Sequence, residues 1–290
     1  MKKLLLILFI ILITVSGLSA QSAVLDDFND ALNSFLGEIN TALPDSAVVG
    51  GTWSNAYIGQ LIGVPPHFGI GIAAGITRFP VQALKDAIEL TGADLPVDTL
   101  ILPNFAVEGR IGGIVLPFDL GFRFGMLPEV KINKVSVKYL NFGADIRYAI
   151  LKDRAVIPAL SVGIGYYHTS GSVGYTFSPS ELGIVGIPPQ YTQDSELGID
   201  FSSNVIEAKV QVSKNIVVIT PYAGLAGYVA FSDSNYTVAN QKGSNKETLY
   251  GARVFGGLSF NIAVVKIDLY GMYNFVSGNW GANAGLRVQI

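Results

Sequence analysis

Residues 279–290 read NWGANAGLRVQI, and this stretch decides the fold. Every second residue from Trp280 to Ile290 is apolar, and the residues between them are polar or glycine. Side chains of a β-strand point alternately to its two faces, so this pattern gives a strand with one apolar face and one wet face. The stretch therefore predicts a strand that separates a hydrocarbon medium from a polar interior.

The same alternation recurs from Phe68 onward. The predicted strands centre on residues 68–77, 105–111, 118–126, 140–150, 160–167, 206–212, 219–229, 253–262, 265–275 and 280–290. Half of the chain is hydrophobic, yet no apolar run after residue 20 reaches the roughly 20 residues that a spanning helix needs. The period predicts an all-β fold: an antiparallel transmembrane β-barrel of about ten strands over residues 67–290, an even strand number as bacterial barrels require.

The connections between the predicted strands alternate in length. Short turns are predicted at 113–116, 151–155, 213–215 and 262–264, and longer connections at 79–103, 127–133, 177–198 and 232–247, before a tight SGN at 277–279. Barrels of this kind place short turns in the periplasm and long loops outside. The barrel is therefore expected to start and finish on the periplasmic side. Counts of eight or twelve strands depend on how residues 47–65 and 79–103 are used; we expect 79–103 to be an external loop with a short helix.

The first twenty residues predict a secretory signal peptide. Lys2 and Lys3 precede an apolar core, which is followed by the small-residue stretch SGLSA. The apolar core is too short for a spanning helix. The chain has no cysteine, which excludes both a lipidated N-terminal cysteine and a disulfide framework. We expect export across the inner membrane.

Residues 21–46 predict an amphipathic helix, and residues 47–66 a connecting segment. Asp26 and Asp27 suit the start of the helix, and Pro44 is expected to end it. Apolar residues at helical spacing form one face: Leu25, Phe28, Leu32, Phe35, Leu36, Ile39 and Leu43. This face is a candidate gate for the lumen.

The pattern over residues 67–290 resembles small bacterial outer-membrane β-barrel proteins as a class. The resemblance implies a place in the outer membrane, contact with its lipid, and insertion by the barrel assembly machinery. The last strand resembles the sorting signal of such barrels, although it closes on Ile290 where an aromatic residue is usual. Aromatic residues near strand ends with outward parity are expected to form interfacial girdles: Tyr148, Tyr166, Tyr250, Tyr273 and Trp280.

Charged residues with inward parity form the candidate functional site. They are Glu108, Arg110, Asp119, Arg123, Asp145, Arg147, Glu207, Lys209, Arg253, Lys266, Asp268 and Arg287, seven basic and five acidic. In a narrow lumen such groups must pair or be hydrated. They give either a polar constriction with slight anion preference or a salt-bridged interior that is simply filled.

Three functions remain open. The first is a narrow channel for a small solute, or a structural barrel. The second is a carrier of a small hydrophobic ligand, with the helix in the lumen or under the periplasmic mouth, as in the hatch of long-chain fatty-acid transporters; alternatively, the helix lies on the inner surface of the membrane. The third is surface adhesion through the loops at 177–198 and 232–247.

Catalysis and cofactor binding are not predicted. Outer-membrane proteases of the omptin type also have ten strands, but their chemistry needs a histidine activated by a carboxylate. The two histidines are His67, before the first strand, and His168, whose parity is lipid-facing. Nothing in the sequence marks a serine beside such a base. No Cys/His cluster suggests a metal, and GIGIAAG at 69–75 lacks dinucleotide-loop spacing. A net charge of −3 gives no reason to expect nucleic-acid binding.

Overall fold

The computed structural model describes residues 21–49, 53–63, 65–80, 82–83, 85, 99–132, 135–177, 195–238 and 241–290. The predicted signal peptide lies outside them. The elements are α2 (Gln21–Ser46), β1 (Phe68–Pro80), β2 (Thr99–Gly112), β3 (Phe118–Ile132), β4 (Val135–Leu151), β5 (Ala159–Phe177), β6 (Ser195–Ser213), β7 (Ile219–Val238), β8 (Gln241–Ile262), β9 (Val265–Asn274) and β10 (Trp280–Gln289). Within these ranges, no helix has the length and apolar character to cross a membrane.

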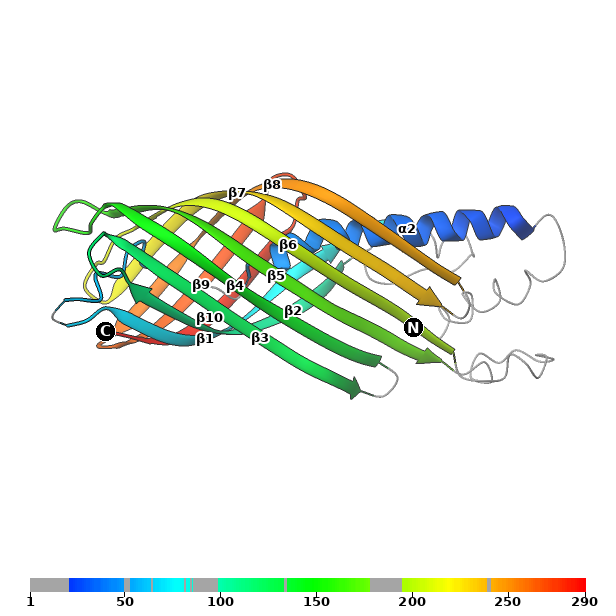
Figure 1. The fold of residues 1–290 in the computed structure, drawn as a ribbon, viewed down its shortest axis with the longest axis horizontal. Helices are drawn as coiled ribbons and strands as arrows, with labels where there is room; N and C mark the ends of the chain where they lie inside the picture. Colours follow the sequence, from blue (N-terminus) through cyan, green and yellow to red (C-terminus); the bar gives the residue numbers. More distant parts are fainter. Residues whose placement is uncertain are drawn as a thin grey trace.

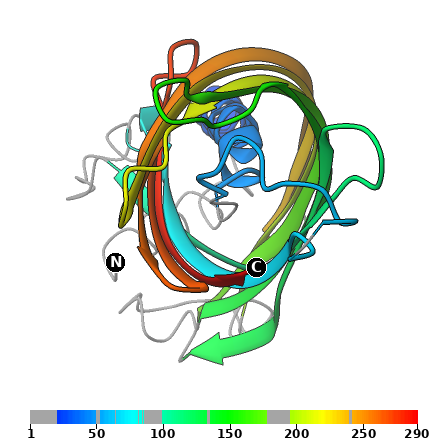
Figure 2. The ribbon, with the colours of Figure 1, turned by 90° about the vertical axis from the view of Figure 1, so that its left-hand side faces the viewer.

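The ten strands form one closed antiparallel barrel (Figures 1 and 2). Each strand pairs with its neighbours in sequence, and β1 closes the ring by pairing with β10 from Gly69↔Gln289 to Thr77↔Gly281. Closure leaves no open sheet edge in hydrocarbon, where unpaired backbone groups are costly. The predicted ten-strand fold is confirmed, and the stretch at 279–290 is its closing strand.

The outer face of the barrel carries an apolar belt. Ile72, Leu225 and Phe122 are each more than half exposed, whereas their sequence neighbours face the interior. The predicted girdle residues Tyr148, Tyr166, Tyr250, Tyr273 and Trp280 are all exposed. A closed barrel with an apolar outer belt is the architecture of an outer-membrane protein, and the belt is its lipid-facing surface.

Two predicted connections are wrong because the strands continue through them. Residues 232–247 belong to β7 and β8, which are joined at 239–240, and residues 127–132 belong to β3. Beyond the apolar belt the outer face is polar, so the alternation that revealed the strands is lost there. Asp233, for example, faces outward and pairs with Lys246 at 2.7 Å, while its neighbours Ser232 and Ser234 are buried inside.

The strands differ in length around the ring. β9 and β10 have 10 residues each, which matches a single membrane crossing, whereas β7 and β8 have 20 and 22. The long strands extend beyond β9 and β10 at the end opposite the short turns (Figure 1). The wall is therefore taller on one side of the barrel.

The N-terminal segment lies inside the barrel. Figure 2 shows α2 within the ring, where its contacts are to β8, β7, β1 and β6. Pro44 does not end the helix, which runs to Ser46. Residues 47–49 and 53–58, predicted to be part of a simple connection, are buried or half-buried in the lumen. The alternative of a helix on the inner membrane surface is wrong for this part of the chain.

Candidate functional site in the barrel lumen

The apolar face of α2 packs against the wall of the barrel. Leu36 and Leu43 are completely buried, and Phe79 of β1, Phe201 of β6 and Tyr236 of β7 lie in the same cluster. Of the seven candidate gate residues, five lie in this cluster: Leu32, Phe35, Leu36, Ile39 and Leu43. The side chains of Leu25 and Phe28 fall outside the described residues. The apolar face is thus covered by side chains of the wall.

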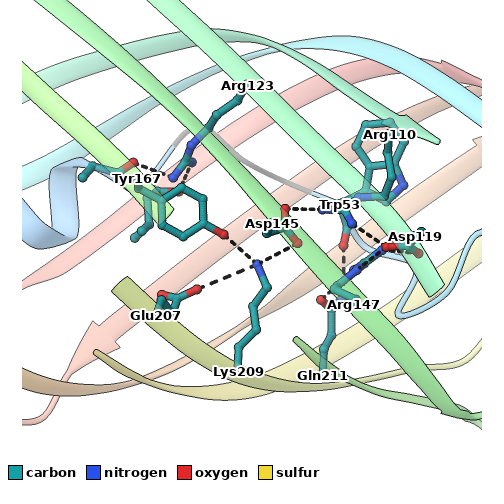
Figure 3. Close-up of polar contacts among 12 residues, drawn as sticks. Trp53, Arg110, Asp119, Arg123, Asp145, Arg147, Tyr167, Glu207, Lys209 and Gln211 are labelled. Carbon is teal, nitrogen blue, oxygen red and sulfur yellow. Dashed lines mark hydrogen bonds and ion pairs between the residues drawn. The ribbon is translucent and has the colours of Figure 1, made fainter. Parts of the chain in front are cut away.

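Below this apolar layer, charged side chains join into one continuous network across the lumen (Figure 3). Arg110 pairs with Asp119 at 2.5 Å and with Asp145 at 2.6 Å. Asp119 also accepts two hydrogen bonds from Arg147, at 2.9 and 3.0 Å. On the other side of Asp145, Lys209 lies 3.4 Å away. Arg110, Asp119, Asp145, Arg147 and Lys209 therefore each have at least one opposite charge beside them, as a narrow interior demands.

Asp45, near the end of α2, ties the N-terminal segment into this network. Arg253 of β8 pairs with Asp45 at 3.0 Å and also with Glu207 of β6. Asn274 of β9 donates to both carboxylate oxygens of Asp45, at 2.9 and 3.0 Å. The twelve predicted lumen residues are seven cations and five anions, and Asp45 supplies another anion to their network. The segment therefore complements the charge of the wall.

Arg123 of β3 holds the next residues of the segment through their backbone. Its guanidinium donates to the carbonyl oxygens of Ala47 at 2.5 Å and Val48 at 2.6 Å. The guanidinium also lies over the ring of Tyr167, with its carbon 4.3 Å from the ring centre. The fork of an arginine suits two adjacent acceptors, so Arg123 clamps the chain where α2 ends.

Residues 53–58 are held further toward the short-turn end. Gln211 donates to the carbonyl oxygens of Trp53 and Ser54, both at 2.9 Å. Arg287 of β10 donates to Ser54 Oγ at 2.7 Å and lies over the Trp53 ring. Asp119 accepts from the backbone N–H of Ile58 at 3.3 Å. Wall residues from several strands thus bind the segment along its length.

The structure places all twelve predicted lumen charges on the inner side of the wall, and it joins most of them. Those that are buried are Glu108, Arg110, Asp119, Arg123, Arg147, Glu207, Arg253, Asp268 and Arg287. Asp268 and Arg287 form a separate pair at 2.7 Å. Lys266 is half-buried near the short-turn end and donates to Asn261 at 2.9 Å. Residue parity was sufficient to find this set.

Sequence reasoning missed the residues that the segment itself contributes. Asp45, Trp53 and Ser54 were placed in a helix end and a connection, and the wall amides Gln211 and Asn274 were not singled out. An aspartate directly after the predicted helix-ending proline was the one available signal. The amides carry no charge and therefore drew no attention as candidates.

The described part of the lumen retains a cavity of about 70 Å³. Its lining includes Glu108, Arg110, Lys209, Tyr222 and Tyr270. A drug-sized ligand needs about 300 Å³ or more, and a water molecule takes about 30 Å³. The cavity is polar and has room for a few waters.

Among the described residues there is no group of three or more His, Asp or Glu side chains arranged to hold a metal ion. His168 lies on the outer face, its ring centre 4.9 Å from that of Phe142 and its Nδ1 2.9 Å from Asn204 Oδ1. His67 stands just before β1 at the short-turn end. Neither imidazole lies among the charges of the lumen.

Comparisons with known proteins found one family model and several solved structures. A family model described as "Family of unknown function (DUF6588)" matches residues 74–290. The outer membrane protease OmpT from Escherichia coli is 11% identical, with 78% of this chain and 97% of that chain covered and a TM-score of 0.44. The translocator domain of the autotransporter NalP from Neisseria meningitidis is also 11% identical, with 90% and 97% covered and a TM-score of 0.42. No curated protein matches.

Proposed function

The chain belongs to the DUF6588 family of unknown function, and we propose that it is a structural outer-membrane barrel that its own N-terminal segment keeps closed. The observation that carries this proposal is the occupied lumen. Wall residues bind the segment from the apolar cluster around Leu36 to the backbone N–H of Ile58, and the cavity at the central charge network among the described residues measures about 70 Å³. A hydrated solute path would need a continuous opening through this region.

A gated narrow channel is the second candidate, and the nature of the contacts favours it. Ion pairs and hydrogen bonds hold residues 45–49 and 53–58 to the wall, in addition to the apolar contacts of Ala47, Val48 and Val49. Buried ion pairs add little net stability, because their desolvation offsets much of their attraction. Withdrawal of the segment would expose the twelve predicted lumen charges, among which cations outnumber anions by two, and this excess suits a small anion.

The carrier and adhesin alternatives receive less support. A hydrophobic ligand would have to displace wall side chains from the apolar face of α2, where Leu36 and Leu43 are fully buried. For adhesion, the segment at 232–247 is paired strand rather than a free loop, and most of 177–198 lies outside the described residues. We propose a non-enzymatic role as well, since both histidines lie away from the lumen charges.

Planar-bilayer conductance of the full-length refolded protein tests the proposal. We expect no steady conductance. The Asp45→Asn variant removes the charge that ties the segment to Arg253, and Asp153→Asn at a short turn is its matched control. Channel openings in the Asp45→Asn variant alone would favour the gated channel. No conductance in the unmodified protein or in either variant would favour the structural barrel. Steady conductance of the unmodified protein would contradict both.

A further inference from the structure

The N-terminal segment enters the barrel from the end opposite the short turns. Asn40 Nδ2 donates to the carbonyl oxygen of Asn245 at 3.0 Å, and Ser234 Oγ donates to that of Leu36 at 3.2 Å. Ser234 of β7 and Asn245 of β8 are register partners near the ends of these strands that lie opposite the short turns. Figure 1 shows the first turns of α2 extending past the ends of β7 and β8.

The segment then runs the full height of the lumen. Asp45 meets Arg253 in the central network. Farther on, the N–H of Ala56 donates to Ser213 Oγ at 2.8 Å, and the N–H of Leu61 donates to the carbonyl oxygen of Gly113 at 3.0 Å. Ser213 and Gly113 stand at short turns, where β1 also begins. The chain therefore crosses the membrane thickness inside the barrel before its first strand.

The orientation of the barrel follows from its two ends. One end carries the short connections at 113–117, 152–158, 214–218 and 263–264 and the start of β1. At the other end the long strands project beyond the apolar belt, and their outer faces are polar, as the exposed pair Lys246–Asp233 shows. Short turns face the periplasm in barrels of this kind, so the projecting end faces outside.

From this path we propose a further function: the barrel delivers its own N-terminal helix to the cell surface. The first turns of α2, from Gln21, lie outside the cell, and contacts of residues 45–49 and 53–58 with the wall tether them through the lumen. The surface element is then a helix, not a loop. The inference uses the segment described above but does not depend on closure, because a conducting barrel can display the same helix.

Three contacts fix the position of α2 along the lumen. The cluster around Leu36 fixes its apolar face to β6, β7 and β1, Arg253 binds its end at Asp45, and Arg123 binds the two carbonyls that follow. Each of these partners lies on the wall, so the position of the helix is set by the closed barrel. A partner molecule outside would meet α2 together with the projecting rims of β7 and β8.

Single-cysteine labelling tests the proposal cleanly, because the chain has no cysteine of its own. Asp30→Cys marks an exposed position on α2, Lys246→Cys the projecting wall, and Val217→Cys a short turn where the side chain is 92% exposed. Each full-length variant is made in a diderm host and checked for the heat-modifiable migration of a folded barrel. Intact cells are then treated with a membrane-impermeant maleimide, before and after permeabilisation of the outer membrane.

We expect Asp30→Cys and Lys246→Cys to react on intact cells, and Val217→Cys only after permeabilisation. If Asp30→Cys reacts only after permeabilisation, or never, while Lys246→Cys reacts on intact cells, the proposal is overturned. Reversed labelling of the two barrel controls would overturn it too. If Asp30→Cys does not fold, an epitope inserted between Ala20 and Gln21 replaces it: antibody binding to intact cells supports surface display, and binding only after permeabilisation rejects it. The bilayer experiment fails or succeeds separately, since it measures closure rather than sidedness.

Discussion

Arg253 of β8 and Asp45 of α2 form an ion pair of 3.0 Å in which both side chains are at most 1% exposed. The arginine also pairs with Glu207, so one cation serves a carboxylate of the wall and a carboxylate of the N-terminal segment. Arg253 and Asp45 lie far apart in sequence and belong to different parts of the fold. The pair thus couples the closed barrel to the segment that fills it.

The two partners should differ in their contribution to stability. Arg253→Gln leaves both Asp45 and Glu207 without their main cation, and we expect a loss of about 3 to 5 kcal/mol in the free energy of unfolding. Asp45→Asn leaves Arg253 paired with Glu207, so a loss of about 1 to 2 kcal/mol is expected. Urea unfolding in lipid vesicles measures both. Equal losses would show that Asp45 and Glu207 do not share the arginine.

Arg123 should stabilise the protein through its clamp on the backbone. Arg123→Gln removes two charge-assisted hydrogen bonds to Ala47 and Val48, and we expect about 2 to 3 kcal/mol less stability. Arg123→Lys retains the charge but not the forked guanidinium, so its stability should lie between that of Arg123→Gln and that of the unmodified protein. The exposed turn residue Arg154 provides the control, with Arg154→Gln expected near zero. An equal effect of both glutamine variants would reject the clamp.

Asp119 should be the most sensitive carboxylate of the network. It is fully buried and accepts from Arg110, Arg147 and the N–H of Ile58. Asp119→Asn leaves two arginines short of an anion, so we expect a loss of about 3 to 5 kcal/mol. The thermal shift of the folded band on gels, together with urea unfolding, measures it.

Asp153 is the matched control for Asp119. It pairs with Lys214 at a short turn, where solvent access keeps the expected loss in Asp153→Asn to about 0 to 1 kcal/mol. Partial burial raises the pKa of Asp153, but hydrogen bonds from Lys214 and Asn215 outweigh it and leave the pKa below its ordinary value. Its small contribution is therefore present near neutral pH and lost as the pH falls. A loss as large as that of Asp119→Asn would contradict the network's central role.

The structure shows where sequence reasoning succeeds and where it fails. The belt was predictable because hydrocarbon and lumen impose opposite demands on adjacent residues, as in Trp280 to Ile290. The lumen position of residues 47–49 and 53–58 was not predictable, because these residues meet wall side chains on all sides and so have no period. Trp53, Ser54 and Ala56 are all buried, although their polarity differs. The parts of β7 and β8 beyond the belt were not predicted, because their outer faces meet water and carry polar residues such as Asp233. The apolar alternation that marks the other strands is therefore lost there.

Val217 offers a prediction about the short turns. Its φ of 52° is in the left-handed region, which a β-branched residue rarely adopts, and its side chain is 92% exposed. Val217→Asn should raise the free energy of unfolding by about 1 kcal/mol by relieving this strain. Val218→Asn, in the same turn without a positive φ, is the control. A loss of stability at Val217 instead would indicate that its side chain is held in lipid.

Cross-linking of the segment to the wall tests the central claim most directly. Ser46 Oγ donates to Asn104 Oδ1 at 3.1 Å, and both residues are buried. We predict that a Ser46→Cys, Asn104→Cys double variant of the full chain forms a disulfide in the outer membrane under mild oxidant. The control pair Ser46→Cys, Ser161→Cys, with the second cysteine near the short-turn end of β5, should not. If neither pair forms and the cysteine at position 46 reacts freely with a soluble maleimide, the segment does not fill the lumen.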